Sequence, residues 1–284
     1  MSHTNPCRPH HIRIRMAGVT DTGQHRDANE DSIFVDNHHC LAIVADGMGG
    51  HNAGEIASRI AIEVTSQFIM AGLRIEGSTE NAFSTAEPLQ DLMDKSIQLA
   101  NRRILQESSN DNKKSGMGTT IVCLLFCNNW FVIGNIGDSR CYRFRDGKIT
   151  QLTEDHSWIQ SMVKQGKIDK EDAKHHSQRG LLLQALGNRE VNPSFTSGCP
   201  QIGDVYILCS DGLTEVVSDN TIGFVLSQDG SPQKTADKLV ELANENGGPD
   251  NISVVVVKIL PPRKSKSTNK ADNTEYTGES SSEQ

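Results

Sequence analysis

Carboxylates stand at one end of several apolar runs in this sequence. Five places share the arrangement: Asp46 after residues 41–45, Asp138 after 131–136, Asp211 after 205–209, Asp250 before 252–257, and Glu30 with Asp31 before 33–35. Buried carboxylates repel one another, and each is costly to bury unless a positive charge lies among them. Two or more hard cations with oxygen ligands would remove this repulsion, so the pattern indicates a divalent-cation site.

Such a site could hydrolyse a phosphate ester, a reaction in which two cations about 3.5–4 Å apart share a water molecule. Asp46 could bridge both cations, and the carbonyl of Gly47 could be a ligand because glycine lets the backbone approach closely. Asp211 and Asp250 could complete the ligand set of one cation. Arg26, in the stretch RDANED, could hold the phosphate oxygens with its planar guanidinium group.

Other phosphate-binding and nucleophile motifs do not occur in the sequence. A GxGxxG pattern starting at Gly47 fails because Asn52 occupies the position of the third glycine, and neither a Walker A loop nor a GxSxG elbow is present. An EF-hand loop is absent as well. Cys7 and Arg13 have the spacing of a thiol-phosphatase loop, but the stretch between them lacks glycine, so a thiol mechanism is the weaker alternative.

The composition excludes some classes of partner. The 284 residues carry a formal net charge of −8, with a pI near 5.7, which argues against nucleic acid or an anionic membrane. No apolar run approaches the roughly 18 residues of a membrane span. The N-terminal stretch MSHTNPCRPHHIRIR lacks an apolar signal core, so we expect a cytoplasmic protein. We also expect a monomer, with the seven cysteines as reduced, mostly structural thiols.

Hydrophobic periodicity predicts alternating strands and helices. We expect strands over residues 12–19, 33–36, 40–45, 119–126, 130–136, 139–145, 148–152, 194–198, 204–209 and 252–259. We expect helices starting at 52–55 and lying over 89–107, 213–217, 221–227 and within 231–248. The first helix has Ile56, Ile60, Val64 and Phe68 on one face. The strands between 119 and 152 are predicted to form an antiparallel meander.

Eight motifs occur in an order and at a spacing that resemble one enzyme family. They are DTGQHRDANEDS, VADGMGGHNAGEIAS, SGMGTT, GNIGDSR, LTEDHSW, LLLQALG, LCSDGL and GGPDNIS. Over about residues 12–260 the chain resembles the metal-dependent protein phosphatases of type 2C, in their bacterial form. The resemblance implies an α+β fold, a four-layer α-β-β-α sandwich of two mainly antiparallel sheets flanked by helix pairs. It also implies a manganese or magnesium pair at one edge of the sandwich.

The resemblance assigns roles to individual residues. Asp46 matches the ligand that bridges both ions, and Gly47 matches the carbonyl ligand. Asp211 and Asp250 match the other ligands of the first ion. Glu30 matches the acid that serves the second ion, often through water.

Further roles follow from the same resemblance. Asp31 matches a carboxylate next to the acid of the second ion, and Arg26 matches the arginine that binds phosphate. Asp138 matches a third, weaker ion site that bacterial members share with the aspartate at Asp211. Residues 156–186, predicted here as a mostly helical insertion, match a mobile flap beside the site.

Several of these positions have simpler alternatives. Met48 stands where eukaryotic relatives have a histidine proposed as the proton donor, as is usual in bacterial members. His51 is a candidate donor in this chain, or else a surface or helix-capping histidine. Arg26 could be a surface ion-pair arginine, and Asp138 could be a hairpin turn residue.

The resemblance implies one phosphatase domain over residues 12–260. The polar composition of residues 261–284 predicts a disordered tail, and we expect a flexible N-terminus over residues 1–11. The expected reaction is hydrolysis of phosphoserine and phosphothreonine in proteins by a water that bridges two Mn²⁺ or Mg²⁺ ions, opposing a bacterial serine/threonine kinase. A non-catalytic regulator is one alternative, although it would be expected to have lost metal acids that are present here. A phosphatase for small phosphate esters is the other.

Overall fold

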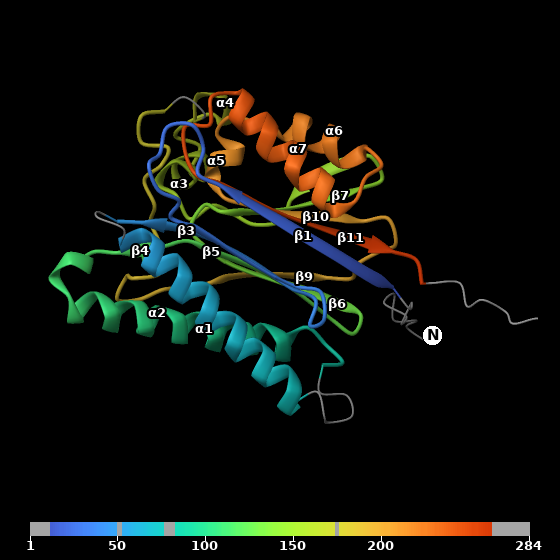
Figure 1. Ribbon diagram of the computed structural model, residues 1–284, viewed down its shortest axis with the longest axis horizontal. Coiled ribbons are helices and arrows are strands. Elements are labelled where there is room, and N and C mark those ends of the chain that lie inside the picture. Colours follow the sequence, from blue (N-terminus) through green and yellow to red (C-terminus); the bar gives the residue numbers. More distant parts are fainter. Residues whose placement is uncertain (1–11, 50–52, 77–82, 174–175, 263–284) are drawn as a thin grey trace, which may run out of the picture.

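The computed structural model describes residues 12–49, 53–76, 83–173 and 176–262. In this part of the chain two β-sheets lie face to face, and helices cover both outer faces (Figure 1). This arrangement confirms the α+β, four-layer α-β-β-α sandwich expected from the sequence.

The first sheet has five strands in the order β1-β11-β10-β7-β8, and its neighbouring strands are antiparallel. The strands are β1 (Arg13–Asp21), β11 (Ile252–Leu260), β10 (Val205–Cys209), β7 (Arg140–Arg145) and β8 (Lys148–Gln151). Strand β11 reads ISVVVVKIL, a nearly continuous apolar run, because both of its faces are buried in the sandwich.

The second sheet has the order β2-β3-β5-β6-β9, and a two-residue strand, β4, pairs with the end of β3. The strands are β2 (Asp31–Asp36), β3 (Leu41–Met48), β4 (Gly118–Thr119), β5 (Ile121–Cys127), β6 (Trp130–Ile136) and β9 (Ser194–Gly198). Alternate residues of β3 face opposite sides. Ile43 packs with the helices, whereas Val44 packs against the other sheet.

The predicted meander is wrong, because the chain changes sheets between β6 and β7. Strands β5 and β6 pair in the second sheet, whereas β7 and β8 pair in the first. Gly137, at the crossing, has φ +97°, a conformation that glycine adopts without the strain of a side chain. A Cβ at this position would also lie 2.6 Å from Cγ2 of Thr120. Periodicity predicted the individual strands but could not assign them to sheets.

The helices form the outer layers. They are α1 (Ala53–Glu76), α2 (Glu87–Asn110), α3 (Trp158–Lys164), α4 (Lys170–Ala173), α5 (Asp211–Thr214), α6 (Asp219–Ser227) and α7 (Pro232–Glu245), with a 3-10 turn η1 (Asn112–Lys114). One apolar core lies between the second sheet and α1 and α2, another between the two sheets, and a third between the first sheet and α6 and α7.

Helix α1 packs on a face different from the predicted one. The predicted face, from Ile56 to Phe68, is only partly buried, whereas the small residues Ala57 and Ala61 are completely buried. Alanine lets the helix lie close to the sheet, and the larger side chains pack at the flanks. Over Ala53–Ile75 this helix also has the length and mean hydropathy of a membrane span, which the sequence analysis missed. It packs against β3 and α2, as a core helix does.

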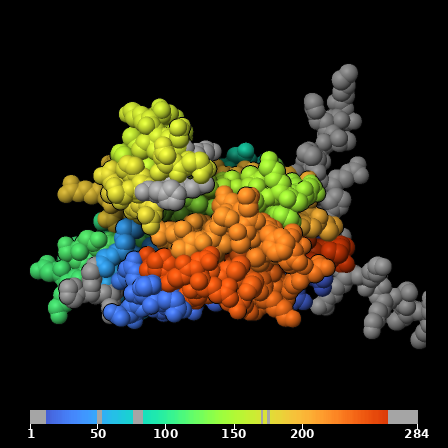
Figure 2. Space-filling model, turned by 90° about the horizontal axis from the view of Figure 1, so that it is seen from above, coloured from blue at the N-terminus to red at the C-terminus, as the bar shows by residue number. Residues whose placement is uncertain are grey.

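Residues 156–186 are less helical than predicted. In their described part, only α3 and α4 are helical, with 7 and 4 residues. Ser157 pairs with Leu182 within the segment. The amide of His156 donates to the carbonyl of Gly137 at 2.9 Å, and Leu186 pairs with Thr119 beside β4, so the segment begins and ends against the sandwich. Figure 2 shows this segment, in yellow, projecting from the body of the molecule.

Most cysteines agree with the expectation of reduced thiols. Within the described ranges, Cys40, Cys123, Cys127, Cys141 and Cys209 are free. Cys199 is disulfide-bonded, which corrects the expectation for that residue, because cysteine spacing in the sequence does not by itself reveal a disulfide. The alternative thiol site at Cys7 lies outside the described residues.

Candidate metal centre

Strand ends from both sheets meet at one edge of the sandwich. In the second sheet, Asp46 near the end of β3 lies directly opposite Asp31, the first residue of β2. In the first sheet, Asp211 follows β10 and begins α5, and Asp250 lies just before β11. Asp138 lies in the crossing between the two sheets. The structure therefore brings together acids that are far apart in the sequence.

Asn251 fixes the loop that precedes β2. Its Oδ1 accepts a hydrogen bond from the amide of Glu30 at 2.8 Å, and its Nδ2 donates to the carbonyls of Thr22 and Ala28, each at 2.9 Å. These bonds hold Glu30 against the start of β11, next to Asp250. The sequence analysis assigned no role to this asparagine, although it lies inside the motif GGPDNIS.

The glycines after Asp46 allow three segments to touch. A Cβ on Gly47 would lie 2.2 Å from the carbonyl oxygen of Gly54, and a Cβ on Gly54 would lie 2.6 Å from Oε2 of Glu30. The amide of Gly47 also donates to the carbonyl of Glu30 at 3.2 Å. Side chains at either glycine would push the end of β3, the start of α1 and Glu30 apart.

The clustered acids resist ionisation. Burial is the largest cause, and it raises the pKa of Asp46 well above its ordinary value, with further contributions from the other carboxylates. Burial likewise raises the pKa of Asp211 to about 6, of Asp31 to about 7 and of Asp138 to about 8. The carboxylates that raise the pKa of Asp46 come from both sheets and from the crossing.

Two buried carboxylate oxygens have no hydrogen-bond partner within the described ranges, namely Oδ1 of Asp31 and Oδ1 of Asp211. Leaving such atoms unpaired is costly, and a cation among them would satisfy both oxygens and relieve the repulsion. No group of three or more acids, cysteines or histidines in the described part already has the arrangement of a closed ion site. An all-oxygen set of this kind fits Mn²⁺ or Mg²⁺.

Arg26 lies at the edge of the acid cluster. Its Nη2 is 2.5 Å from Oδ2 of Asp250, and its side chain is 52% exposed. Burial opposes the guanidinium charge, but Asp250, Glu30 and Asp211 outweigh it and raise the pKa of Arg26. The arginine is therefore ion-paired at the site, with about half of its surface open to a ligand.

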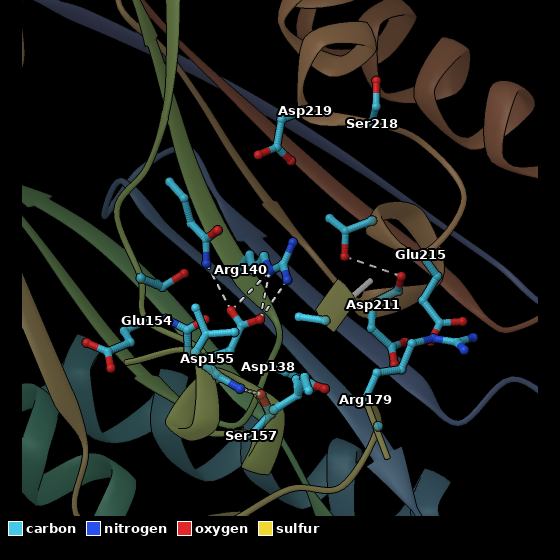
Figure 3. Close-up of a pocket in the computed structure, with 18 of the residues that line it drawn as sticks. Asp138, Arg140, Glu154, Asp155, Ser157, Arg179, Asp211, Glu215, Ser218 and Asp219 are labelled. Atoms are coloured by element: carbon cyan, nitrogen blue, oxygen red, sulfur yellow. Dashed lines mark hydrogen bonds and ion pairs between the residues drawn. The ribbon is translucent and has the colours of Figure 1, made fainter. Parts of the chain in front are cut away.

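A cavity of about 1080 Å³ opens beside Asp138 and Asp211 (Figure 3). In its wall, Arg140 makes a bidentate contact with Asp155, with Nε 3.0 Å from Oδ1 and Nη2 2.6 Å from Oδ2. Residues of α3 and α6 complete the lining. Because β6 and β7 belong to different sheets, Asp138 is not a hairpin turn residue. It faces the same cavity as Asp211, the residue with which it is predicted to share an ion.

His51 lies outside the described residues, so its role stays a prediction. Met48 pairs with Gly118 of β4 and offers no titratable group.

The sequence analysis also missed the hydroxyl groups around Asp46. Thr119 and Thr120 hydrogen-bond to its backbone, and Ser139 contacts Thr120. The two threonines belong to the motif SGMGTT, which served only as a family marker. The sequence feature that could have identified them is a pair of small polar residues directly before a buried strand.

Comparison with known proteins identifies the family. The family profile described as Protein phosphatase 2C matches residues 22–239. The chain belongs to this family.

Two curated relatives show the degree of similarity. The chain is 38% identical over 250 residues to the serine/threonine protein phosphatase PstP of Mycobacterium tuberculosis. This match covers 87% of this chain but only 45% of that protein. It is 37% identical over 243 residues to the serine/threonine phosphatase stp of Listeria monocytogenes, with 84% of this chain and 93% of the relative covered.

Solved structures agree with the fold. The crystal structure of Mycobacterium tuberculosis PstP matches with a TM-score of 0.77 and 39% identity, covering 88% of this chain and 99% of that chain. The PstP catalytic domain in complex with two manganese ions matches with a TM-score of 0.76 and 36% identity, covering 88% of this chain and 99% of that chain.

Proposed function

We propose that this chain is a Mn²⁺- or Mg²⁺-dependent protein phosphatase that removes phosphate from phosphoserine and phosphothreonine. The family and the named relatives support the proposal. The observation that carries it is the cluster of buried acids from both sheets, whose pKa values are raised by burial and by one another, and which includes two oxygens without partners among the described residues. Such a cluster is costly in a protein that binds no cation.

The proposed ligands divide between two ions and a weaker third. Asp46 would bridge the pair, with the Gly47 carbonyl, Asp211 and Asp250 on the first ion and Glu30 on the second. Asp138 would hold the third ion together with Asp211. When bound, the ions would lower the pKa of a water for attack on phosphorus.

The protein groups around the ions have separate tasks. Arg26 would hold the phosphate oxygens through its two-pronged guanidinium group, so that phosphorus faces the attacking water. Asp31 lies opposite Asp46, and its Oδ2 accepts a hydrogen bond from Ser210 at 2.7 Å, which fixes this buried carboxylate. His51 is the candidate proton donor to the leaving group. No side-chain nucleophile is required by this mechanism.

We also propose a biological setting. Residues 12–260 would form one phosphatase domain, acting as a cytoplasmic monomer on phosphorylated proteins and opposing a serine/threonine kinase. The net charge of −8 supports partners other than nucleic acid or anionic membranes. The acids that a non-catalytic regulator would be expected to lose are all present.

The test is phosphate release from a phosphothreonine peptide by protein stripped with EDTA and then resupplied with Mn²⁺, Mg²⁺ or Zn²⁺. We expect no turnover without metal and recovery with Mn²⁺ or Mg²⁺. A parallel panel of small phosphate esters should be hydrolysed with lower kcat/KM. Turnover that survives full chelation would overturn the metal mechanism, and a preference for small esters would overturn the protein substrate.

A further inference from the structure

Thr120 lies between the backbone of Asp46 and the crossing that carries Asp138. We propose that Thr120 is a positioning residue that holds these two acids in a fixed relation, and so couples the ion pair at Asp46 to the third ion at Asp138. The proposal rests on the metal-dependent function proposed above.

Thr120 occupies a break in the hydrogen-bond ladder along β3. Strand β3 pairs with β5 up to Val44 and with β4 from Gly47 onward, and between these points Asp46 lies opposite Thr120 in the same register. The amide of Thr120 donates to the carbonyl of Asp46 at 2.9 Å, as an ordinary ladder bond does. The amide of Asp46, however, donates to the side-chain hydroxyl of Thr120 at 3.0 Å.

A second hydroxyl group, that of Thr119, also bonds to Asp46 at this break in the ladder. Thr119 Oγ1 lies 2.8 Å from the carbonyl oxygen of Asp46 and 2.9 Å from that of Thr120, and it donates its proton to this pair. Thr119 is 0% and Thr120 is 1% exposed, so water does not compete for these bonds. Because the direction of a side chain follows its backbone, the two hydroxyls determine where the carboxylate of Asp46 points.

The hydroxyl of Thr120 also contacts the segment between β6 and β7, which carries Asp138. Its Oγ1 lies 2.7 Å from Oγ of Ser139, the residue after Asp138, and Ser139 is 1% exposed. Gly137, the residue before Asp138, approaches Thr120 so closely that a Cβ there would lie 2.6 Å from Cγ2. One threonine therefore bonds the backbone of the bridging acid and contacts both neighbours of the acid predicted to hold the third ion.

Three substitutions separate this role from simple packing. Thr120→Val keeps the shape but removes the hydroxyl, Thr120→Ser keeps the hydroxyl, and Ser139→Ala removes only the link to the crossing. Thr65→Val is the matched control, because Thr65 is a completely buried threonine of α1 whose hydroxyl has no hydrogen-bond partner within the described ranges.

The experiment is calorimetric titration of metal-stripped protein with Mn²⁺, with a thermal melt of each variant in EDTA. Loss of a group that orients a metal ligand typically weakens metal binding by roughly 10–100-fold. We expect Thr120→Val to weaken the tight pair and the weaker ion by about that factor, and Thr120→Ser and Thr65→Val to bind like the wild type. Ser139→Ala should weaken only the third ion, by about 10-fold or more.

Wild-type affinity for every ion in both Thr120→Val and Ser139→Ala would overturn the proposal, even with lower melting temperatures, since that pattern describes packing alone. If Thr120→Val does not fold, Ser139→Ala decides, and an unchanged third-ion affinity overturns the coupling. A wild-type protein that binds no Mn²⁺ would instead overturn the proposed function, so the two failures are distinguishable.

Discussion

Arg26 and Asp250 form an ion pair at the candidate metal centre, with Nη2 2.5 Å from Oδ2. The other oxygen of Asp250, Oδ1, accepts the amide of Asn251 at 2.8 Å. Asp250 is also the predicted ligand of the first ion, so a bound cation would compete with Arg26 for this carboxylate. The guanidinium group, which is half exposed, would then be available to a phosphate.

Replacing Arg26 should affect the substrate more than the metals. We expect Arg26→Ala to raise KM for a phosphothreonine peptide and to lower kcat/KM by about 10–100-fold, because a charge-assisted bidentate contact contributes about 1.5–3 kcal/mol. Its Mn²⁺ affinity should stay at or above the wild-type value, since a competitor for Asp250 is removed. Steady-state kinetics and calorimetry measure both quantities.

Two further variants make the Arg26 test specific. Arg26→Lys should recover only part of kcat/KM, because an ammonium group keeps the charge but not the planar fork. Arg103→Ala, which removes an exposed arginine of α2, should leave the kinetics unchanged. The exposed ion pair contributes little stability, so an unchanged KM with a clearly lower melting temperature would remove Arg26 from the site.

Neutralising Asp211 should abolish turnover and stabilise the metal-free fold. Asp211→Asn deletes a ligand, so we expect turnover to fall by about 100-fold or more. Because burial and neighbouring acids raise the pKa of Asp211 to about 6, its charge destabilises the empty site. We expect a gain of about 1–3 kcal/mol in the free energy of unfolding in EDTA at pH 7.5.

Asp237→Asn, at an exposed aspartate of α7, is the matched control and should change neither quantity. Denaturant unfolding in EDTA and Mn²⁺-dependent turnover provide the measurements. Near wild-type turnover in Asp211→Asn would refute its assignment as a ligand.

The stability of the metal-free protein should fall as pH rises. The pKa values of Asp211, Asp31 and Asp138 are raised to about 6, 7 and 8, above the unfolded value of about 3.9. The folded state therefore retains protons that the unfolded chain has released. The stabilisation from these groups is complete below about pH 4 and is lost as pH rises through the folded pKa values.

Thermal melts from pH 5 to 8.5 test this expectation. In EDTA the melting temperature should decrease across the range, and with Mn²⁺ the decrease should disappear because the ion binds the deprotonated carboxylates. A melting temperature that rises with pH in EDTA would contradict the pKa assignments.

Thiol alkylation under native conditions should leave catalysis largely intact. Burial raises the pKa of Cys127 to about 11 and of Cys209 to about 12, so their reactive thiolate forms are scarce at neutral pH. The proposed mechanism also uses no thiol nucleophile. Iodoacetamide treatment followed by peptide turnover and mass mapping checks this, and activity loss that tracks modification of Cys7 would favour the thiol-phosphatase alternative.

The sequence predicted those site residues whose type is unusual for their position. Asp46, Asp211 and Asp250 could be selected because an acid at the end of a buried strand is unusual, and the structure brings all three to one edge of the sandwich. Helix α2 was likewise predicted by periodicity.

Other features depend on contacts between distant segments, which periodicity does not encode. The passage from β6 to β7 looks like a hairpin in sequence, but the chain changes sheets there. The buried face of α1 includes Ala57 and Ala61, beside Ile62 and Ile69, because the helix lies close to the sheet, a distance that the sequence does not give. The role of Thr120 was missed because its partners lie 74 and 19 residues away.

The central claim is that the acids from both sheets form a two-ion centre bridged by Asp46. Anomalous diffraction at the manganese edge, from crystals of the full chain grown or soaked in Mn²⁺, tests it most directly. We expect two strong peaks about 3.5–4 Å apart, both coordinated by Asp46, with Asp211 and Asp250 on one of them and a weaker peak beside Asp138. The absence of any peak within coordinating distance of Asp46, or ions bound without Asp211 and Asp250, would contradict the account.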